Sequence, residues 1–93
     1  MTNAITNTIT IEHIEGLVAN EQYIRVENTT MMICVLTLSN GYNVTGESAC
    51  VDPANFNEAK GKSIARANAV NKIWMLEGYL LNNRLNRLKL FDK

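Results

Sequence analysis

Two strand-like runs separated by an Asn-Gly pair constrain the fold of this chain more than any other feature. Residues 31–38 read MMICVLTL, and they are followed by SNGY and then by NVTGESAC. Asn and Gly both tolerate positive φ, so the pair Asn40-Gly41 is a strong signal for a two-residue hairpin turn. With this pair at the centre of the turn, Leu36 is predicted to face Thr45.

The same register assigns each side chain of the hairpin to one face of the sheet. The predicted core face consists of Met31, Ile33, Val35, Val44 and Cys50. The opposite face would hold Cys34, Leu36, Leu38, Thr45 and Glu47. Cys34 and Cys50 then point away from each other, so we expect no disulfide between them. A bulge at Gly46 would change the register beyond that residue.

Helices are predicted on both sides of the hairpin. Thr10 is a suitable N-cap for a short helix over about 11–20, and a brief extended piece is expected around 23–26. Asp52-Pro53 indicates a helix start, Asn55 could cap a second one, and the pattern is helical from about Glu58 to about Leu88. We therefore predict one α+β domain over residues 1–93, in which the long helix packs on the hairpin. Residues 1–9 form a polar leader, and residues 82–93 form a helical C-terminal extension.

The second half of the long helix is apolar on nearly all sides. Residues 73–81 read IWMLEGYLL, whereas a helix that is buried on one face only should be amphipathic. We therefore expect a second chain to cover this segment and predict a homo-oligomer. The predicted interface is a seam with the spacing of a short coiled coil, consisting of Trp74, Leu81, Leu85 and Leu88.

Composition excludes several classes of protein. Hydrophobic residues make up 46% of the 93 residues and charged residues 19%, which is typical of a globular domain. Nine basic and nine acidic residues balance, so a strongly cationic surface for nucleic acid is not expected. The polar N-terminus does not resemble a signal peptide, and no apolar run is long enough to span a membrane. Two cysteines in this context are expected to be reduced thiols in a cytoplasm.

We do not expect an enzyme, a metal site or a cofactor. The chain contains one histidine, His13, and a metal site needs more ligands than one histidine and two cysteines on opposite faces. Ser48 lacks the surrounding pattern of a nucleophile elbow, and the chain contains no phosphate-binding or dinucleotide motif. Four carboxylates could serve in acid–base chemistry, but each has a structural interpretation. Glu47 would be a cross-strand partner and Asp52 a helix cap. Glu58 would be a first-turn acid and Glu77 an ion-pair partner.

The stretch from residue 40 to residue 56, NGYNVTGESACVDPANF, is the most distinctive part of the chain. NGYNV has the chemistry of a turn, and DPANF has the chemistry of a helix start. GESA has no comparable structural explanation. Glu47 follows a glycine that allows close approach of a backbone or a ligand, so it is the leading candidate for a functional residue.

The combination of NG, GESACV, NF, ARANA and KIWxLEGYLL resembles a family of small accessory proteins of tailed phages. This family is widespread in phages of proteobacteria and was catalogued from an Escherichia and a Shigella phage. The resemblance covers residues 34–81 closely and most of the rest loosely. Met75 stands where the family usually has proline, so the helix should run smoothly through that point. The tail NNRLNRLKLFDK is individual to this chain.

The resemblance implies a phage origin, the cytoplasm of an infected bacterium, and no particular reaction. Small phage accessory proteins often act against host defence or host metabolism. One hypothesis is a non-enzymatic, oligomeric sponge that sequesters a nucleotide-derived host immune signal. Cations would neutralise phosphates and an aromatic ring would stack on a base. The predicted ligand-binding residues are Thr45, Glu47, Ser48, Lys62, Arg66, Lys72, Trp74 and Tyr79. Lys62, Arg66 and Lys72 could equally form a solvated face, and Trp74 could be a packing residue.

The alternative hypothesis is an inhibitor that binds a host defence or metabolic protein through its surface. Leu36, Leu38 and Tyr42, on the predicted outer face of the hairpin, would form that surface. Convergence of the polar residues of two subunits into one cavity favours the sponge, and scattered outward positions favour the inhibitor or a structural role. A nucleic-acid binder ranks third, since it depends only on Arg84, Arg87 and Lys89.

Overall fold

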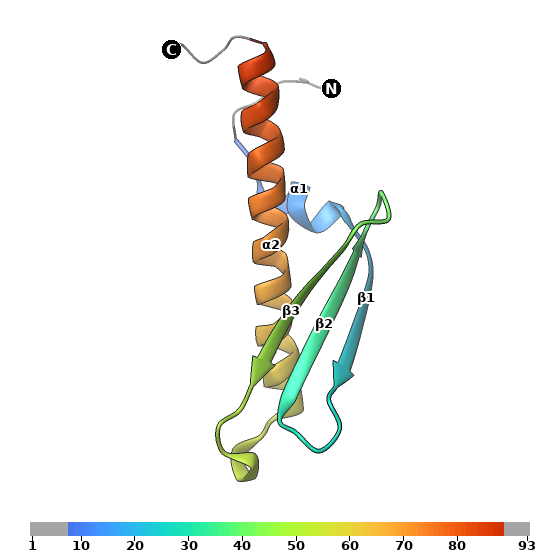
Figure 1. The fold of residues 1–93 in the computed structure, drawn as a ribbon, viewed down its shortest axis with the longest axis vertical. Helices are drawn as coiled ribbons and strands as arrows, with labels where there is room; N and C mark the ends of the chain where they lie inside the picture. The colour runs from blue at the N-terminus through green and yellow to red at the C-terminus, as the bar shows by residue number, and fades with distance from the viewer. Residues whose placement is uncertain (1–7, 89–93) are drawn as a thin grey trace.

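The computed structural model describes residues 8–88, and it is an α+β fold as predicted. The elements in chain order are α1 (Ile11–Gly16), β1 (Val18–Arg25), β2 (Met31–Leu38), β3 (Asn43–Ala49), a turn of 3₁₀ helix η1 (Pro53–Asn55) and α2 (Glu58–Arg87). The three strands form an antiparallel sheet in the order β1-β2-β3, and α2 packs on one face of it (Figure 1). Most of the predicted polar leader and the end of the predicted extension, residues 1–7 and 89–93, lie outside the described residues.

The hairpin between β2 and β3 forms where it was predicted, but with a longer loop. The backbone N–H of Leu38 donates to the carbonyl of Tyr42, and the N–H of Gly41 donates to the carbonyl of Leu38, both at 2.8 Å. Gly41 alone in this loop has positive φ, at +92°. These features are those of a three-residue loop, a turn followed by a left-handed glycine, and the predicted two-residue turn is wrong.

The longer loop moves the register of the hairpin by one residue. Leu36 lies opposite Val44 and Cys34 lies opposite Gly46, where the prediction placed Thr45 and Glu47. Because side chains alternate along a strand, this shift places the even-numbered residues of β2, rather than the odd-numbered ones, on the same face as Val44. The buried positions of β2 are Met32, Cys34, Leu36 and Leu38. The predicted assignment of Met31, Ile33 and Val35 to the core is therefore wrong, whereas Val44 is buried as predicted.

The N-terminal third of the chain differs from the prediction in one element. Thr10 caps α1 as predicted, through its hydroxyl oxygen and the N–H of His13, but the helix ends at Gly16. A full strand, β1, follows and pairs with β2 from Val18 to Arg25, where only a brief extended piece had been expected. The register of this pair shifts between Val18 and Asn20, at a bulge that lies next to the end of α1. Ile14 is the fully buried residue of α1 and packs in the core cluster.

Helix α2 lies directly against β3 at Gly46. A Cβ at this position would overlap the backbone nitrogen of Ala69 and the backbone oxygen of Ala65, so the helix and the strand meet backbone to backbone. Ala65 and Ala69 are fully buried, and Ile73 continues this buried row one turn further along α2. The helix runs without a break from Glu58 to Arg87 and passes through Met75, in agreement with the sequence prediction.

Gly46→Ala tests this contact, and Gly78→Ala, further along α2, is its control. Gly46→Ala should destabilise the fold by about 3 kcal/mol, since overpacking a core costs about 1–3 kcal/mol and a backbone contact cannot adjust as a side chain does. Gly78→Ala, in an open part of α2 with nothing within 4 Å, should stabilise it by up to about 1 kcal/mol. Urea unfolding followed by circular dichroism measures both. Equal stability of the Gly46→Ala variant and the parent chain would disprove the close contact.

Candidate functional site

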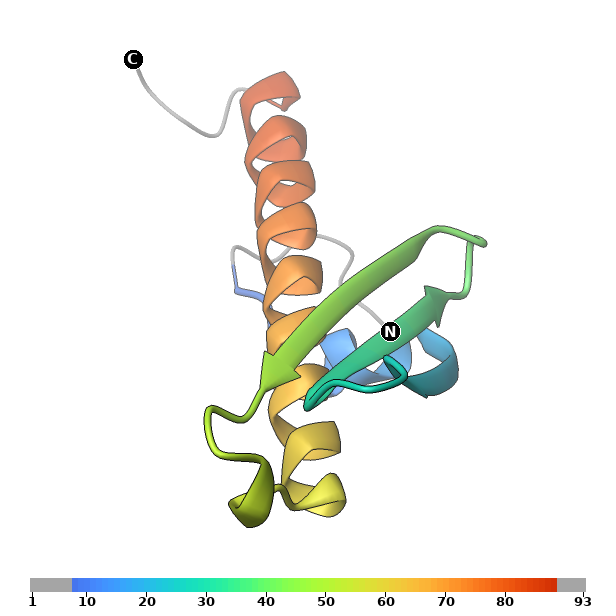
Figure 2. The same cartoon turned by 60° about the horizontal axis from the view of Figure 1, so that its bottom comes forward.

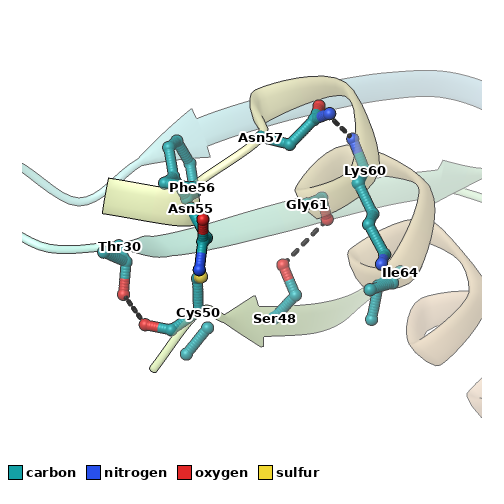
Figure 3. Close-up of a pocket in the computed structure, with 10 residues that line it drawn as sticks. Thr30, Ser48, Cys50, Asn55, Phe56, Asn57, Lys60, Gly61 and Ile64 are labelled. Atoms are coloured by element: carbon teal, nitrogen blue, oxygen red, sulfur yellow. Dashed lines mark hydrogen bonds between the residues drawn. The ribbon is translucent and has the colours of Figure 1, made fainter. Parts of the chain in front are cut away.

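A cavity of about 320 Å³ lies at the corner where β3 leads into η1 and α2 begins (Figure 3). Figure 2 brings this end of the molecule forward, with η1 and the first turns of α2 beside each other. The volume is at the lower end of the range found for small-molecule pockets. The residues that line it are Thr30, Ser48, Ala49, Cys50, Asn55, Phe56, Asn57, Lys60, Gly61 and Ile64.

Hydrogen bonds to backbone groups build the walls of this corner cavity. The hydroxyl of Ser48 donates to the carbonyl of Gly61 at 2.8 Å, which ties β3 to the first turns of α2. The hydroxyl of Thr30 donates to the carbonyl of Cys50, which ties the start of β2 to the end of β3. The thiol of Cys50 in turn lies 3.1 Å from the carbonyl of Asp52, which accepts from it. These hydroxyl and thiol protons are therefore engaged within the chain.

Helix caps form the remaining polar part of the corner. The carboxylate of Asp52 accepts from the N–H of Ala54 at 3.0 Å and from the side-chain amide of Asn55 at 3.1 Å, and it caps η1 as predicted. The start of α2 is capped by the side-chain oxygen of Asn57, which accepts from the N–H of Lys60 at 3.1 Å. Asn55, which had been considered for this role, lies within η1.

The lining of the corner cavity carries one positive charge, and the carboxylate of Asp52, which is bonded to the lining residue Asn55, lies beside it. Lys60 is the charged residue that lines it, and its ammonium group has no ion-pair or hydrogen-bond partner among the described residues. The cavity also lies at the N-terminal end of α2, where the helix macrodipole adds partial positive charge. Both contributions favour a negatively charged ligand.

Phe56 provides the aromatic surface of the corner. Its side chain is half-buried and packs against the core cluster. The guanidinium carbon of Arg25 lies over the ring, 4.3 Å from its centroid, which is the geometry of a cation–π interaction. This contact holds the ring in a defined position at the wall of the cavity. The arrangement suits binding of a flat, anionic molecule, whereas the described residues contain no cluster of three or more His, Cys, Asp or Glu that could hold a metal ion.

The predicted ligand-binding residues lie in several separate places within one chain. Ser48 alone lines the corner cavity. Thr45 and Lys72 line a second, more open groove between the start of β3 and the middle of α2. Glu47 is exposed on the sheet face away from α2, and only its backbone carbonyl is engaged, by the side-chain amide of Asn68 at 2.8 Å. Tyr79 is 70% exposed on α2.

Arg66 and Lys62 lie on a third surface, beside α1 and β1. Arg66 donates to both oxygens of Glu15 at 2.8 and 3.0 Å, and to both oxygens of Glu21 at 3.2 Å. One guanidinium therefore joins α2 to α1 and to β1. Lys62 lies 3.9 Å from the carboxylate of Glu58, and its ammonium nitrogen is 5.5 Å from the centroid of the Tyr23 ring.

The Arg66 cluster shifts the pKa values of its members. Hydrogen bonds from Arg66 are the main reason that the pKa values of Glu15 and Glu21 lie below the ordinary value of 4.5. The same bonds raise the pKa of Arg66. Burial, followed by the hydrogen bond to Glu21, raises the pKa of Tyr23 to about 12. The charges of this cluster are thus satisfied within the chain, and its primary effect is to hold three elements together.

The residues of the predicted oligomer seam differ in their exposure. Trp74 is half-buried and packs against the core cluster of its own chain, and Leu85 is 7% exposed. Leu81 is half-buried, whereas Leu88 is 47% exposed. The large exposed side chains on this half of α2 lie mainly on another face, which includes Met75 and Tyr79.

The prediction missed Phe56, Asn57 and Lys60 as members of a site. A signal for Phe56 was present in the sequence, because the stretch of residues 40–56 contains more polar residues than a simple turn needs. Lys60 gives no such signal, since a lysine in the first turns of a helix resembles any solvated cation. Only the fold places it beside the end of β3.

Comparison with known proteins places the chain among small phage proteins. It matches the model of a phage protein family, described as the N4 Gp49/phage Sf6 gene 66 family, over residues 9–85. The chain belongs to this family, which confirms the resemblance seen in the sequence. No curated protein and no solved structure is significantly similar to it. None of the helices within residues 8–88 has the length and apolar character needed to cross a membrane.

The Arg66 cluster predicts how stability depends on pH. The depressed pKa values mean that Glu15 and Glu21 stabilise the fold above pH 4.5, and that this contribution is lost as pH falls through their folded-state values. Arg66→Met should therefore lower stability by about 1–2 kcal/mol at neutral pH, a modest effect because the carboxylates are partly exposed. It should also flatten the decline in stability below pH 4.5.

Urea unfolding at several pH values measures this effect, and Lys62→Met is the matched control. Lys62 makes a longer and more exposed ion pair, so its replacement should leave the acid dependence of stability unchanged. An Arg66→Met variant that keeps the acid dependence of the parent chain would contradict the assignment.

Proposed function

We propose that this protein is a non-enzymatic phage counter-defence protein, which acts as a homo-oligomer in the cytoplasm of the infected bacterium. Its role is to bind and sequester a nucleotide-derived host immune signalling molecule. The observation that carries the proposal is the corner cavity, which combines an unpaired lysine, a fixed aromatic ring and neutral polar groups in one place. Membership of a phage protein family supports the setting.

The ligand class follows from the groups that line the corner cavity. The ammonium group of Lys60 suits a phosphate, because charge-assisted hydrogen bonds to phosphate oxygens are strong. The ring of Phe56 suits stacking or edge contact with a base. The side-chain NH₂ group of Asn57 can donate to a base or sugar oxygen, since only its oxygen is used in capping α2. Small nucleotides carry all three complementary features.

The same lining supports binding rather than catalysis. The cavity residues consist of hydroxyls, amides, one thiol, one lysine and apolar side chains, with no histidine or carboxylate among them. General acid–base catalysis usually depends on such groups with tuned pKa values. A protein that only holds its ligand lowers the free concentration of that ligand in proportion to the number of sites.

Isothermal titration calorimetry with linear and cyclic nucleotides of one to three units tests the proposal. At least one of them should bind, and Lys60→Ala should weaken its binding at least tenfold, as expected for loss of a charged hydrogen bond. Lys62→Ala is the matched control, because that lysine lies outside the corner cavity and should leave affinity unchanged.

Two results would contradict the proposal. One is the absence of binding for every nucleotide in the panel, and the other is binding that tolerates both Lys60→Ala and Phe56→Leu. Inorganic phosphate serves as a second control, since a site that requires the base and the phosphate together should bind phosphate far more weakly.

The alternative function, an inhibitor that binds a host protein, is favoured by one observation. The sheet face away from α2 is covered by no element within residues 8–88 and exposes Ile24, at 48%. Leu36 and Leu38, which had been predicted for such a surface, are buried in the core cluster instead. Ile24→Glu would abolish an inhibitor that uses this face and would leave nucleotide binding intact.

A further inference from the structure

The second half of α2 carries an apolar stripe that no other element covers within residues 8–88. Met75, Leu76, Tyr79 and Leu80 are exposed by 69%, 37%, 70% and 52%. The pairs Met75/Tyr79 and Leu76/Leu80 are each four residues apart, and Leu76 and Tyr79 are three apart, which places all four together on one face of the helix. We call this set the α2 stripe.

The stripe is exposed because the sheet crosses α2 at an angle. Lower on the helix, Ala65 and Asn68 contact β3 on the corresponding face. Further along, the tip of the hairpin diverges from the helix, and α2 continues beyond the sheet in both views (Figures 1 and 2). The face that β3 covers at one end therefore emerges into solvent at the other.

The overall dimensions show that the molecule is elongated. The radius of gyration is 16.8 Å, whereas a compact domain of this length is expected to have a value of about 12 Å. The extents of 54 × 27 × 18 Å reflect the projecting half of α2. A long helix with exposed apolar side chains gains stability when another chain buries them.

We propose that the α2 stripe pairs with the same stripe of a second copy of this chain, with the two helices antiparallel about a two-fold axis. The axis lies midway between Leu76 and Tyr79. Leu76 then faces Tyr79 of the second copy, and Met75 faces its Leu80. A two-fold axis makes every such contact twice, which suits a surface that each copy carries.

Charge distinguishes this arrangement from the parallel one. Antiparallel pairing places Lys72 opposite Asn83 of the second copy, so no like charges meet. Parallel pairing in register would instead bring the two Lys72 side chains together. The dipoles of two neighbouring helices attract each other when the helices are antiparallel and repel when they are parallel, which also favours the antiparallel arrangement.

The open groove beside the α2 stripe can accommodate a side chain of the second copy. It has a volume of about 330 Å³ and lies between Tyr42 and Thr45 of the hairpin and Met75 and Leu76 of α2. Tyr79 of the second copy faces Leu76 in the antiparallel pairing, so its ring can enter this groove. The hairpin tip thus takes part in the contact together with the helix.

This inference rests on the homo-oligomer in the proposed function and names its contact face. The corner cavity lies at the opposite end of α2, so pairing and nucleotide binding are measured separately. A protein that pairs without binding nucleotides would contradict the proposed ligand and leave this inference standing. A monomer that binds nucleotides would contradict this inference and the homo-oligomer, and it would leave the proposed ligand standing.

Light scattering coupled to size-exclusion chromatography tests the face of contact. The parent chain should form dimers, or larger assemblies built from dimers, at about 100 µM. The Tyr79→Glu variant should be a monomer with an unchanged circular dichroism spectrum. Leu88→Glu, on the predicted seam, should leave the assembly intact. A monomeric parent chain, or a loss of assembly in Leu88→Glu but not in Tyr79→Glu, would overturn the proposal.

The double variant Lys72→Glu/Asn83→Lys tests the direction of pairing. Antiparallel helices would gain two opposite-charge contacts, so the dimer should dissociate about fivefold less readily at low salt. Parallel helices would gain like-charge contacts and dissociate more readily. Weaker or unchanged association of this variant would therefore overturn the antiparallel arrangement.

Discussion

The backbone contact between α2 and β3 at Gly46 determines most of this structure. Because position 46 has no side chain, the helix lies on the strand at Ala65 and Ala69, closer than ordinary side chains would allow. This closeness brings the start of α2 within reach of the Ser48 hydroxyl. The corner cavity is a consequence, since its two walls are the end of β3 and the first turns of α2.

The general fold could be predicted from local chemistry, whereas the register of the hairpin could not. Helix α2, its start and the Thr10 and Asp52 caps follow from spacing and capping residues. The loop of the hairpin depends on whether Asn40 adopts positive φ, and the sequence permits either choice. MMICVLTL is apolar at nearly every position, so the binary pattern cannot reject the wrong face. Strand β1 is mostly polar and exposed, which hides its alternation.

The candidate site was harder to predict because it depends on contacts between distant segments. Arg66 was expected to bind a ligand, but Glu15 and Glu21 approach it from α1 and β1, and neither approach is visible in the sequence. Lys60 lacks such partners among the described residues and lies beside the polar corner. Its role in the proposed site therefore comes from the fold rather than from its residue type.

We propose that the corner cavity holds a nucleotide-derived signal during infection. Native mass spectrometry of the protein purified from phage-infected cells that carry a signalling defence system tests it most directly. We expect an oligomer that carries a nucleotide-sized mass, and we expect this mass to be absent when the Lys60→Ala variant is purified in the same way. A bare oligomer that gains mass only when a host protein is added would contradict it.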